Sequence, residues 1–250
     1  MILYKIDMNE EQLHAMRHTA AHVLAAAVKR LYPEAKFGVG PVIDNGFFYD
    51  IALPEPLSKE RLPKIEKVMR RIVQEGHAMV REEMPMDEAV KLFESQDQPF
   101  KVELLNDLKE RGTTKLNAEE LQDIDPENVD KATVYRTGEF VDLCRGPHVE
   151  NVKELGVFKL WKVSGAYWRG DQERNEQMQR IYGLAFETQE ELDAYLEMLK
   201  EAEKRDHRKL GKELDLFAFS DLVGPGLPLF TPRGTIMREQ LTDFVWQLMK

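Results

Sequence analysis

Two histidines, His18 and His22, stand four residues apart in a segment rich in helix-forming residues. An α-helix turns once every ~3.6 residues, so both imidazoles are expected on one face, about one turn apart. In that arrangement two ring nitrogens can hold a metal ion or a polarised water between them. A zinc protease of the HExxH type is excluded, because Thr19 stands where the catalytic glutamate would be.

The chain contains one cysteine, Cys144, and a histidine follows it at His148. Together with His18 and His22, these residues provide three imidazoles and one thiol, the number and kind of ligands of a tetrahedral zinc site. The spacing leaves two interpretations open. Either the two segments build one joint site, or the helix carries two ordinary polar histidines and the cysteine is buried separately.

Composition narrows the class of protein. Of 250 residues, 42% are hydrophobic and 32% are charged, which is typical of a globular protein of one or two domains. The net charge of −10 argues against a general nucleic-acid coat protein but leaves room for a local basic patch that binds RNA. One cysteine cannot form an internal disulfide, which predicts a cytoplasmic location. No membrane span or secretory signal is recognised in the sequence.

The first half of the chain shows helical patterns over residues 9–31, 58–76 and 86–96. Asn9 and Gln12 form a capping-box pattern at the start of the first helix. Residues 37–51 are predicted to form a hairpin with a type I′ turn at Asn45-Gly46, which places Phe48 and Tyr49 on opposite faces. Residues 100–105 fit either a strand or the start of a helix, and residues 106–131 are predicted to be polar surface helix and loop.

The segment 132–144 is predicted to be a strand in which Phe140, Asp142 and Cys144 share one face. Asp142 and Cys144 therefore point into the same cleft. Gly146-Pro147 then turns the chain, which brings His148 back toward Cys144.

Two further strands are predicted, over residues 158–163 and 179–186. Between them lies a glycine-flanked loop, residues 164–171, in which Tyr167 and Trp168 precede Arg169. Aromatic rings beside an arginine can stack on an unpaired base, whereas a plain turn with a buried tryptophan explains the pattern equally well.

The character of the sequence changes at Thr188, which with Glu191 forms a second capping-box pattern. It opens a charged helix that is predicted to reach about residue 210. Turns and short strands are expected next, and then a helix over residues 235–250. Because no capping signal closes that helix, the chain is expected to be a truncated piece of a longer protein.

Five stretches stand out as longer motifs: His18-Thr-Ala-Ala-His22, Gly40-Pro-Val-Ile-Asp-Asn-Gly-Phe-Phe-Tyr-Asp50, Asp142-Leu-Cys-Arg-Gly-Pro-His148, Gly165-Ala-Tyr-Trp-Arg-Gly-Asp171 and Lys204-Arg-Asp-His-Arg-Lys-Leu-Gly-Lys-Glu-Leu214. In this order, and across essentially the whole chain, they resemble bacterial threonyl-tRNA synthetases.

The resemblance implies an α+β fold, with an antiparallel sheet and helices as in the second additional domain of threonyl- and alanyl-tRNA synthetases. It implies an editing domain over residues 1–187, a linker helix over 188–212, and the truncated start of a class II catalytic domain over 213–250. The motifs that hold ATP, magnesium and the catalytic zinc ion are missing, as is the family's small ubiquitin-like domain. Ester hydrolysis is therefore expected here, but aminoacylation is not.

The resemblance also implies a substrate, tRNA(Thr) mischarged with serine, and a set of catalytic residues: His18, His22, Lys101, Asp142, Cys144 and His148. In this set His18 or His148 positions the water, and Asp142 holds the serine amine or hydroxyl. Lys101 stabilises developing charge or donates a proton to the 3′ oxygen. For substrate binding, the resemblance and the aromatic loop point to Tyr49, Arg145, Tyr167 and Trp168.

The resemblance does not imply that the site requires zinc. In alanyl-tRNA editing relatives the ligand set His18, His22, Cys144 and His148 corresponds to a zinc site, whereas in the threonyl family it can act as a water-binding cleft. The full-length protein is expected to charge tRNA(Thr) with threonine, using ATP, and to form a homodimer, and this chain alone to be a monomer. No membrane partner is expected.

One alternative function comes from another class, a non-catalytic tRNA-binding module or structural zinc module. A freestanding editing factor is disfavoured, because the residues after Leu214 resemble a synthetase body.

Overall fold

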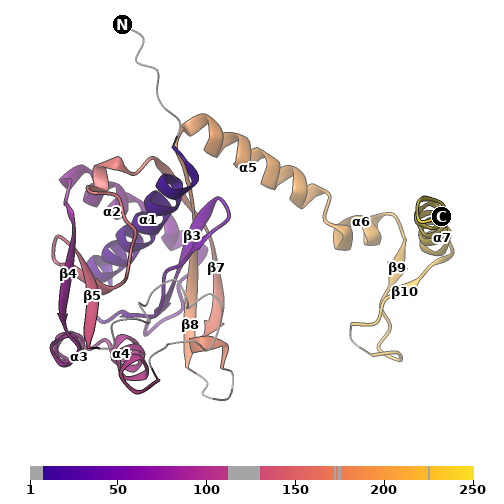
Figure 1. The fold of residues 1–250 in the computed structure, drawn as a ribbon. Helices are drawn as coiled ribbons and strands as arrows, with labels where there is room; N and C mark the ends of the chain where they lie inside the picture. The colour runs from indigo at the N-terminus through magenta and orange to yellow at the C-terminus, as the bar shows by residue number, and fades with distance from the viewer. Residues whose placement is uncertain (1–7, 112–129, 172, 174–175, 225) are drawn as a thin grey trace, which may run out of the picture. The chain divides into compact units, whose positions relative to one another are not determined.

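The computed structural model describes residues 8–111, 130–171, 173, 176–224 and 226–250 (Figure 1). The chain divides into two compact units, Met1–Leu192 and Asp193–Lys250. Of the segment 106–131 that was predicted to be surface helix and loop, residues 112–129 lie outside the described residues. Among the residues described, no helix has both the length and the apolar character that crossing a bilayer requires.

The first unit is an α+β structure, as predicted. Its helices are α1 (Glu10–Leu31), α2 (Leu62–Glu75), α3 (Met86–Ser95), α4 (Pro99–Arg111) and the first turn of α5 (Gln189–Lys204), with short 3-10 turns at Lys59–Arg61, Val152–Glu154 and Trp168–Gly170. Its strands are β1 (Lys36–Phe37), β2 (Val42–Ile43), β3 (Gly46–Ala52), β4 (Met79–Pro85), β5 (Lys131–Thr137), β6 (Phe140–Leu143), β7 (Val157–Tyr167) and β8 (Gln177–Phe186).

Helix α1 runs through the interior of this unit. The predicted capping box is present: the Asn9 side chain accepts from the Gln12 backbone N–H and the Gln12 side chain accepts from the Asn9 N–H, both at 2.9 Å. From Ala15 to Val28 the helix is buried almost without interruption. The many alanines in this stretch allow neighbours to pack closely on several sides, so His18 and His22 are held in the core.

A five-stranded antiparallel sheet follows the order β1-β3-β8-β7, with β2 added beside β3. Within it Tyr49 pairs with Ile181, and Asp50 pairs with Arg180. Successive side chains on a strand point to opposite faces. Tyr49 therefore packs in the core that includes α1, whereas Asp50 lies on the other face of the sheet.

The predicted hairpin of residues 37–51 is present in altered form. The two-residue turn is Asp44-Asn45, because Ile43 pairs with Gly46. A type I′ turn needs positive φ at both central residues, and only Asn45 has it, at 60°. The prediction of a type I′ turn at Asn45-Gly46 was therefore wrong.

The second sheet is three-stranded, in the order β4-β5-β6. The prediction of one strand over 132–144 was wrong, because the chain reverses after Thr137. Gly138 has a φ of 60°, and Thr137 pairs with Phe140, which closes a tight hairpin. The reversal keeps Asp142 and Cys144 on the second arm of this hairpin.

The boundaries of other helices and strands also differ from the predicted ones. Residues 100–105, which fitted a strand or a helix, belong to α4, whose Leu104 and Leu105 are buried. A buried glutamate that was not singled out, Glu66, joins α2 to β7: it accepts from the Leu160 backbone N–H at 3.1 Å and pairs with Lys159. The strand predicted over 158–163 extends to Tyr167, so residues 164–167 are strand rather than loop.

The second unit contains α6 (His207–Glu213), β9 (Phe217–Ala218), β10 (Leu229–Phe230) and α7 (Pro232–Leu248). The single helix predicted to reach residue 210 is two helices, because Asp206 caps a new one by accepting from the Arg208 N–H at 2.8 Å. Likewise α7 begins earlier than predicted. Thr231 caps it, and Pro232 takes the first position, where its missing N–H costs nothing.

Candidate functional site

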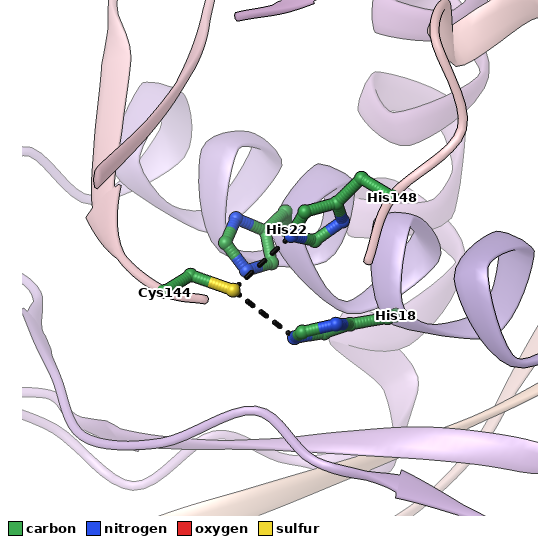
Figure 2. A group of neighbouring side chains, drawn as sticks. All are labelled: His18, His22, Cys144 and His148. Carbon is green, nitrogen blue, oxygen red and sulfur yellow. Dashed lines mark hydrogen bonds between the residues drawn. The ribbon is translucent and has the colours of Figure 1, made fainter. Parts of the chain in front are cut away.

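The two segments predicted to form one site do meet. One cluster is formed by His18 and His22 from α1, Cys144 directly after β6 and His148 from the following loop (Figure 2). Each residue offers one nitrogen or sulfur atom, and these four atoms all lie within 4.8 Å of one another. His18, His22 and Cys144 are each no more than 3% exposed. The interpretation with two ordinary polar histidines and a separate cysteine was therefore wrong.

The hydrogen bonds of His18 and His148 fix which ring nitrogen carries a proton. The Pro147 carbonyl can only accept, so Nδ1 of His18, 3.2 Å away, is the donor. Thr19 Oγ1 donates to the Ala15 carbonyl at 2.8 Å and accepts from the Val149 N–H. Its one proton is thus used, so Nδ1 of His148, at 3.1 Å, donates to it.

Both Nε2 atoms consequently carry lone pairs, and both face the thiol. Cys144 Sγ lies 3.4 Å from Nε2 of His18 and 3.1 Å from Nε2 of His148, as Figure 2 shows. The Gly146 N–H also points at the sulfur, at 3.2 Å. One thiol proton can serve only one of the two nitrogens, so a cation or a water between the ligand atoms would satisfy both.

A buried charge pair adjoins the cluster. Lys101 Nζ lies 2.6 Å from Asp142 Oδ1, and each side chain is at most 4% exposed. The Tyr49 hydroxyl donates to Asp142 Oδ2 and accepts from Lys101 Nζ at 3.1 Å. Nδ1 of His22 is 3.7 Å from Asp142 Oδ2. The carboxylate therefore lies between the lysine and the histidines, although at this distance it makes no hydrogen bond to His22.

Burial keeps the imidazoles neutral near pH 7. It lowers the pKa of His18 to about 4, with His14 adding to the effect. Burial also lowers the pKa of His22 and of His148 well below the usual value, and the neighbouring histidines act in the same direction. Neutral imidazoles can accept a proton, hold a water or ligate a metal.

The loop that returns His148 to Cys144 depends on Gly146, whose φ is 81°. A Cβ at this position would come within 2.5 Å of the Tyr135 hydroxyl. The Tyr135 ring in turn packs edge-on against His148, at 4.3 Å between centroids. Glycine is thus required here by both backbone conformation and space.

A cavity of about 250 Å³ opens beside the charge pair. Lys101 and Asp142 line it together with Lys29 and Arg30 of α1 and Phe140 of β6. The buried pair therefore lies next to a cavity that apolar side chains and side chains of both charges line together.

The donor set fits zinc in kind. In a tetrahedral site with Zn–N of about 2.0–2.1 Å and Zn–S of about 2.3 Å, ligand atoms lie roughly 3.3–3.6 Å apart. The two sulfur–nitrogen distances of 3.1 and 3.4 Å are close to this range. The widest separation allowed by the cluster, 4.8 Å, would have to close by about 1 Å.

Of the remaining predicted site residues, Tyr49 joins the charge pair, and Arg145 follows Cys144 and is half-buried. Tyr167 and Trp168 line a different cavity. Trp168 is only 1% exposed and packs on Phe100, so the buried-tryptophan alternative is the one that the fold adopts.

Sequence reasoning missed Thr19 and Tyr135 as supports of His148. Thr19 was considered only as a residue that excludes a protease. Its place next to His18, in a helix where its hydroxyl reaches the Ala15 carbonyl, was the available signal. No local sequence signal pointed to Tyr135, because its contact with His148 depends on the β5–β6 hairpin.

Comparison with known proteins first gives the class of domain. Residues 132–182 match the family described as the threonyl and alanyl tRNA synthetase second additional domain. That segment carries Asp142, Cys144 and His148, while His18 and His22 lie outside it.

The whole chain is similar to bacterial threonine--tRNA ligases. It is 48% identical to that of Gloeobacter violaceus and 47% identical to that of Anoxybacillus flavithermus, over 94% of the chain in both cases. Identity to threonine--tRNA ligase 2 of Bacillus subtilis is 48% over 96% of the chain. The predicted resemblance is thereby confirmed, and the chain spans about a third of the length of these relatives.

Proposed function

We propose that this chain is the editing part of a threonine--tRNA ligase and hydrolyses the ester that joins serine to tRNA(Thr). The observation that carries the proposal is the buried group of neutral imidazoles beside the Lys101–Asp142 pair. Hydrolysis of an activated ester needs a positioned water, a proton acceptor and a proton donor. The site supplies a candidate for each of these roles.

The water is positioned by His18 or His148. Each presents a lone pair on Nε2, and each is fixed through Nδ1, by the Pro147 carbonyl or by the Thr19 hydroxyl. An imidazole anchored in this way cannot turn away from the water whose proton it accepts. Loss of one such general base typically lowers a rate by about 10²–10⁴.

Lys101 and Asp142 act on the substrate itself. The lysine stabilises negative charge on the attacked carbonyl or protonates the departing 3′ oxygen. Asp142 holds the serine amine or hydroxyl, and Tyr49 forms the wall behind them through its hydrogen bonds to both residues. Burial strengthens each of these interactions relative to water.

Selectivity follows from the size of the substrates. A synthetic site cannot exclude serine sterically, because one methyl group is worth only about 1–3 kcal/mol. A second site that admits serine but has no room for the extra methyl of threonine corrects the error. Arg145 is assigned to the substrate contacts of this second site.

If zinc is bound, His18, His22, Cys144 and His148 hold it, and it would supply a Lewis acid that polarises water. The residue roles above do not depend on it.

The longer protein of which this chain forms part is proposed to activate threonine with ATP and Mg²⁺, to charge tRNA(Thr), and to act as a homodimer in the cytoplasm. Within this chain we assign residues 1–187 to the editing domain, 188–212 to the linker, which consists of two helices, and 213–250 to the start of the catalytic domain.

The second candidate function is a non-catalytic tRNA-binding module or a structural zinc module, and the donor set of the cluster favours the zinc module. His18→Ala and Cys144→Ala separate the two. If the site is catalytic, serine release from seryl-tRNA(Thr) falls at least about 100-fold in His18→Ala, and both variants keep the circular dichroism spectrum of the parent and a cooperative unfolding transition.

The matched control is His77→Ala, since His77 is outside the cluster and pairs with Glu75 near the surface. It is expected to hydrolyse seryl-tRNA(Thr) at the parent rate. Unfolding of both cluster variants, together with loss of bound zinc, would instead support the structural module.

A further inference from the structure

A set of buried contacts joins helix α4 to the short 3-10 turn that follows β7. The Trp168 indole packs on Phe100 with 4.8 Å between the ring centroids, and its Nε1–H donates to Glu103 Oε2 at 3.2 Å. Arg169 Nη1 lies 3.3 Å from Glu103 Oε1 and 2.5 Å from Asp107 Oδ2. The Arg169 side chain is only 4% exposed, and its guanidinium also lies over the Trp168 ring. Two neighbouring side chains of the turn therefore contact three positions of one helix.

Arg169 adopts a backbone conformation that its contacts must maintain. Its φ of 55° and ψ of 19° lie in the left-handed region, which side chains other than glycine rarely adopt. Backbone strain of this kind persists only where the surrounding structure enforces it, and it is concentrated at functional sites. Glu103 and Asp107 are four residues apart on α4, so their carboxylates lie on one face of the helix, where the guanidinium meets both. The strained turn and the helix thus fix each other.

The same helix carries Lys101, which directly follows Phe100 in the sequence. Because a helix turns once every ~3.6 residues, Lys101 lies on a different side of α4 from Glu103, two positions further on. From that side its ammonium reaches Asp142 Oδ1 at 2.6 Å and the Tyr49 hydroxyl at 3.1 Å. A rotation or shift of α4 would carry the ammonium away from both partners. The position of Lys101 therefore depends on whatever holds the helix.

The start of α4 is held by polar contacts of its own. Gln98, which is 4% exposed, accepts from the Phe37 N–H at 2.8 Å and donates to the Ala35 carbonyl at 3.0 Å. The buried Leu104 and Leu105 add apolar packing, which is non-directional and does not by itself set the rotation of a helix.

Lys101 lies in the sequence between two sets of directional contacts. Gln98 precedes it by three residues, and Glu103 follows it by two. The contacts of Gln98 fix the start of the helix, and those of the turn after β7 fix its direction and rotation beyond Lys101.

We propose that Arg169, together with Trp168, is a positioning residue that holds α4 so that Lys101 stays in place beside Asp142. The inference rests on the proposed function, because the part of Lys101 in ester hydrolysis is what makes its exact position matter. Arg169 does not touch the substrate and acts only through Lys101. The buried Trp168 thereby has a role other than stacking on a base.

The first test removes the guanidinium by Arg169→Gly. Glycine adopts the left-handed conformation without strain, which offsets part of the lost contacts. Acetylation by acetic anhydride, followed by mass spectrometry, measures whether the Lys101 ammonium is still buried against Asp142, and the exposed Lys64 of α2 is the internal reference. The labelling rate of Lys101 relative to Lys64 is expected to rise at least about tenfold, because α4 opens locally more often.

A second test asks whether Arg169 acts through Lys101. A misplacement of about 1 Å can lower a rate by about 10²-fold, so the kcat for seryl-tRNA(Thr) is expected to fall about 10- to 100-fold in Arg169→Gly. KM is expected to stay unchanged, because Lys101 acts on charge that develops in the transition state. In a Lys101→Met background no ammonium is left to position, and Arg169→Gly is expected to change kcat less than about twofold. A loss of full size in that background would overturn the inference.

The matched control is Gly170→Ala, in the same turn. Its Cβ would meet no atom within 4 Å, so this variant strains the turn at a φ of 70° without removing a contact to α4. It is expected to keep the labelling rate of Lys101 and the kcat of the parent. A change as large as that of Arg169→Gly would assign the effect to the stability of the turn and overturn the inference.

If Arg169→Gly does not fold, Arg169→Lys takes its place. Lysine keeps the positive charge beside Glu103 and Asp107 but replaces the planar fork by a single ammonium. It is expected to raise the labelling of Lys101 and to lower kcat, each at least about threefold.

Labelling of Lys101 at the parent rate in the folded Arg169 variant would overturn this inference, whatever the deacylation result. If the parent shows no deacylation but Lys101 still loses its protection in the variant, the positioning contact is supported and the hydrolytic function is contradicted. The two proposals therefore fail separately.

Discussion

At the scale of single residues, the site is built from side chains whose protons are assigned by their surroundings. Thr19 and the Pro147 carbonyl hold the Nδ1 protons of His148 and His18, which leaves both Nε2 atoms as acceptors. Burial removes the alternative, the imidazolium, at neutral pH. The chemistry of the cluster thus depends on residues that do not themselves touch the substrate.

The neutral state of His18 predicts the pH dependence of metal-free hydrolysis. Because burial lowers its pKa from 6.5 to about 4, the active, unprotonated form persists as the pH falls through the range where an exposed histidine would be protonated. With a chelator present, the rate of serine release is expected to stay level from about pH 7 to pH 5 and to drop near pH 4. Single-turnover assays across this range would measure it.

A drop centred near pH 6.5 would contradict this assignment, since it would mean that the responsible histidine is not desolvated. The His77→Ala variant should follow the same profile as the parent, because His77 is outside the cluster.

The Lys101–Asp142 pair predicts a stability effect. Asp142→Asn leaves the Lys101 ammonium buried without its counter-charge and is expected to lower the free energy of unfolding by about 3–5 kcal/mol. Adding Lys101→Met to that variant removes the orphaned charge and should recover much of the loss. Urea denaturation of the parent, the single and the double variant measures the difference. A double variant less stable than the single one would show that the charge is not the cause.

At the scale of elements, the loop between Cys144 and His148 decides whether the cluster forms. Gly146 and Gly170 both have positive φ, at 81° and 70°, but only Gly146 has a neighbour in the way of a Cβ. Gly146→Ala therefore combines backbone strain with a clash against Tyr135. Gly170→Ala brings strain alone, which costs about 1–3 kcal/mol.

Gly146→Ala is expected to lower the free energy of unfolding by more than Gly170→Ala does, and to slow serine release as well, because His148 is displaced. Gly170→Ala is expected to leave serine release at the parent rate. Thermal denaturation and deacylation of both variants provide the comparison. Equal effects on stability and rate would mean that Tyr135 does not confine the loop.

The sequence predicted the elements whose signals are local. The α1 capping box, the helical spacing of His18 and His22, and the meeting of Cys144 with His148 all follow from residues close in sequence. The hairpin at Gly138 and the break between helices at Asp206 were not predicted. Each depends on a single residue, and the residues on either side of it continue the same strand-like or helical sequence pattern.

The burial of Trp168 could be stated only as one of two alternatives, since it depends on Phe100, a residue far away in sequence. The contacts of Tyr135 and Glu66 were not predicted for the same reason. Contacts between distant elements fix these side chains, and no local pattern encodes them.

At the scale of the whole molecule, the two units have different surfaces. The first is built around the buried helix α1 and contains the histidine site. In the second, α7 exposes much of its apolar surface: Ile236, Leu241, Phe244, Trp246 and Leu248 are each at least 58% exposed. The candidate chemistry of this chain thus resides in the first unit.

The most direct measurement is deacylation of seryl-tRNA(Thr) and threonyl-tRNA(Thr) by the purified chain, each with and without a chelator. We expect rapid loss of serine, retention of threonine, and little effect of the chelator. Hydrolysis of neither ester, with binding of the tRNA intact, would contradict the catalytic claim and favour the binding module.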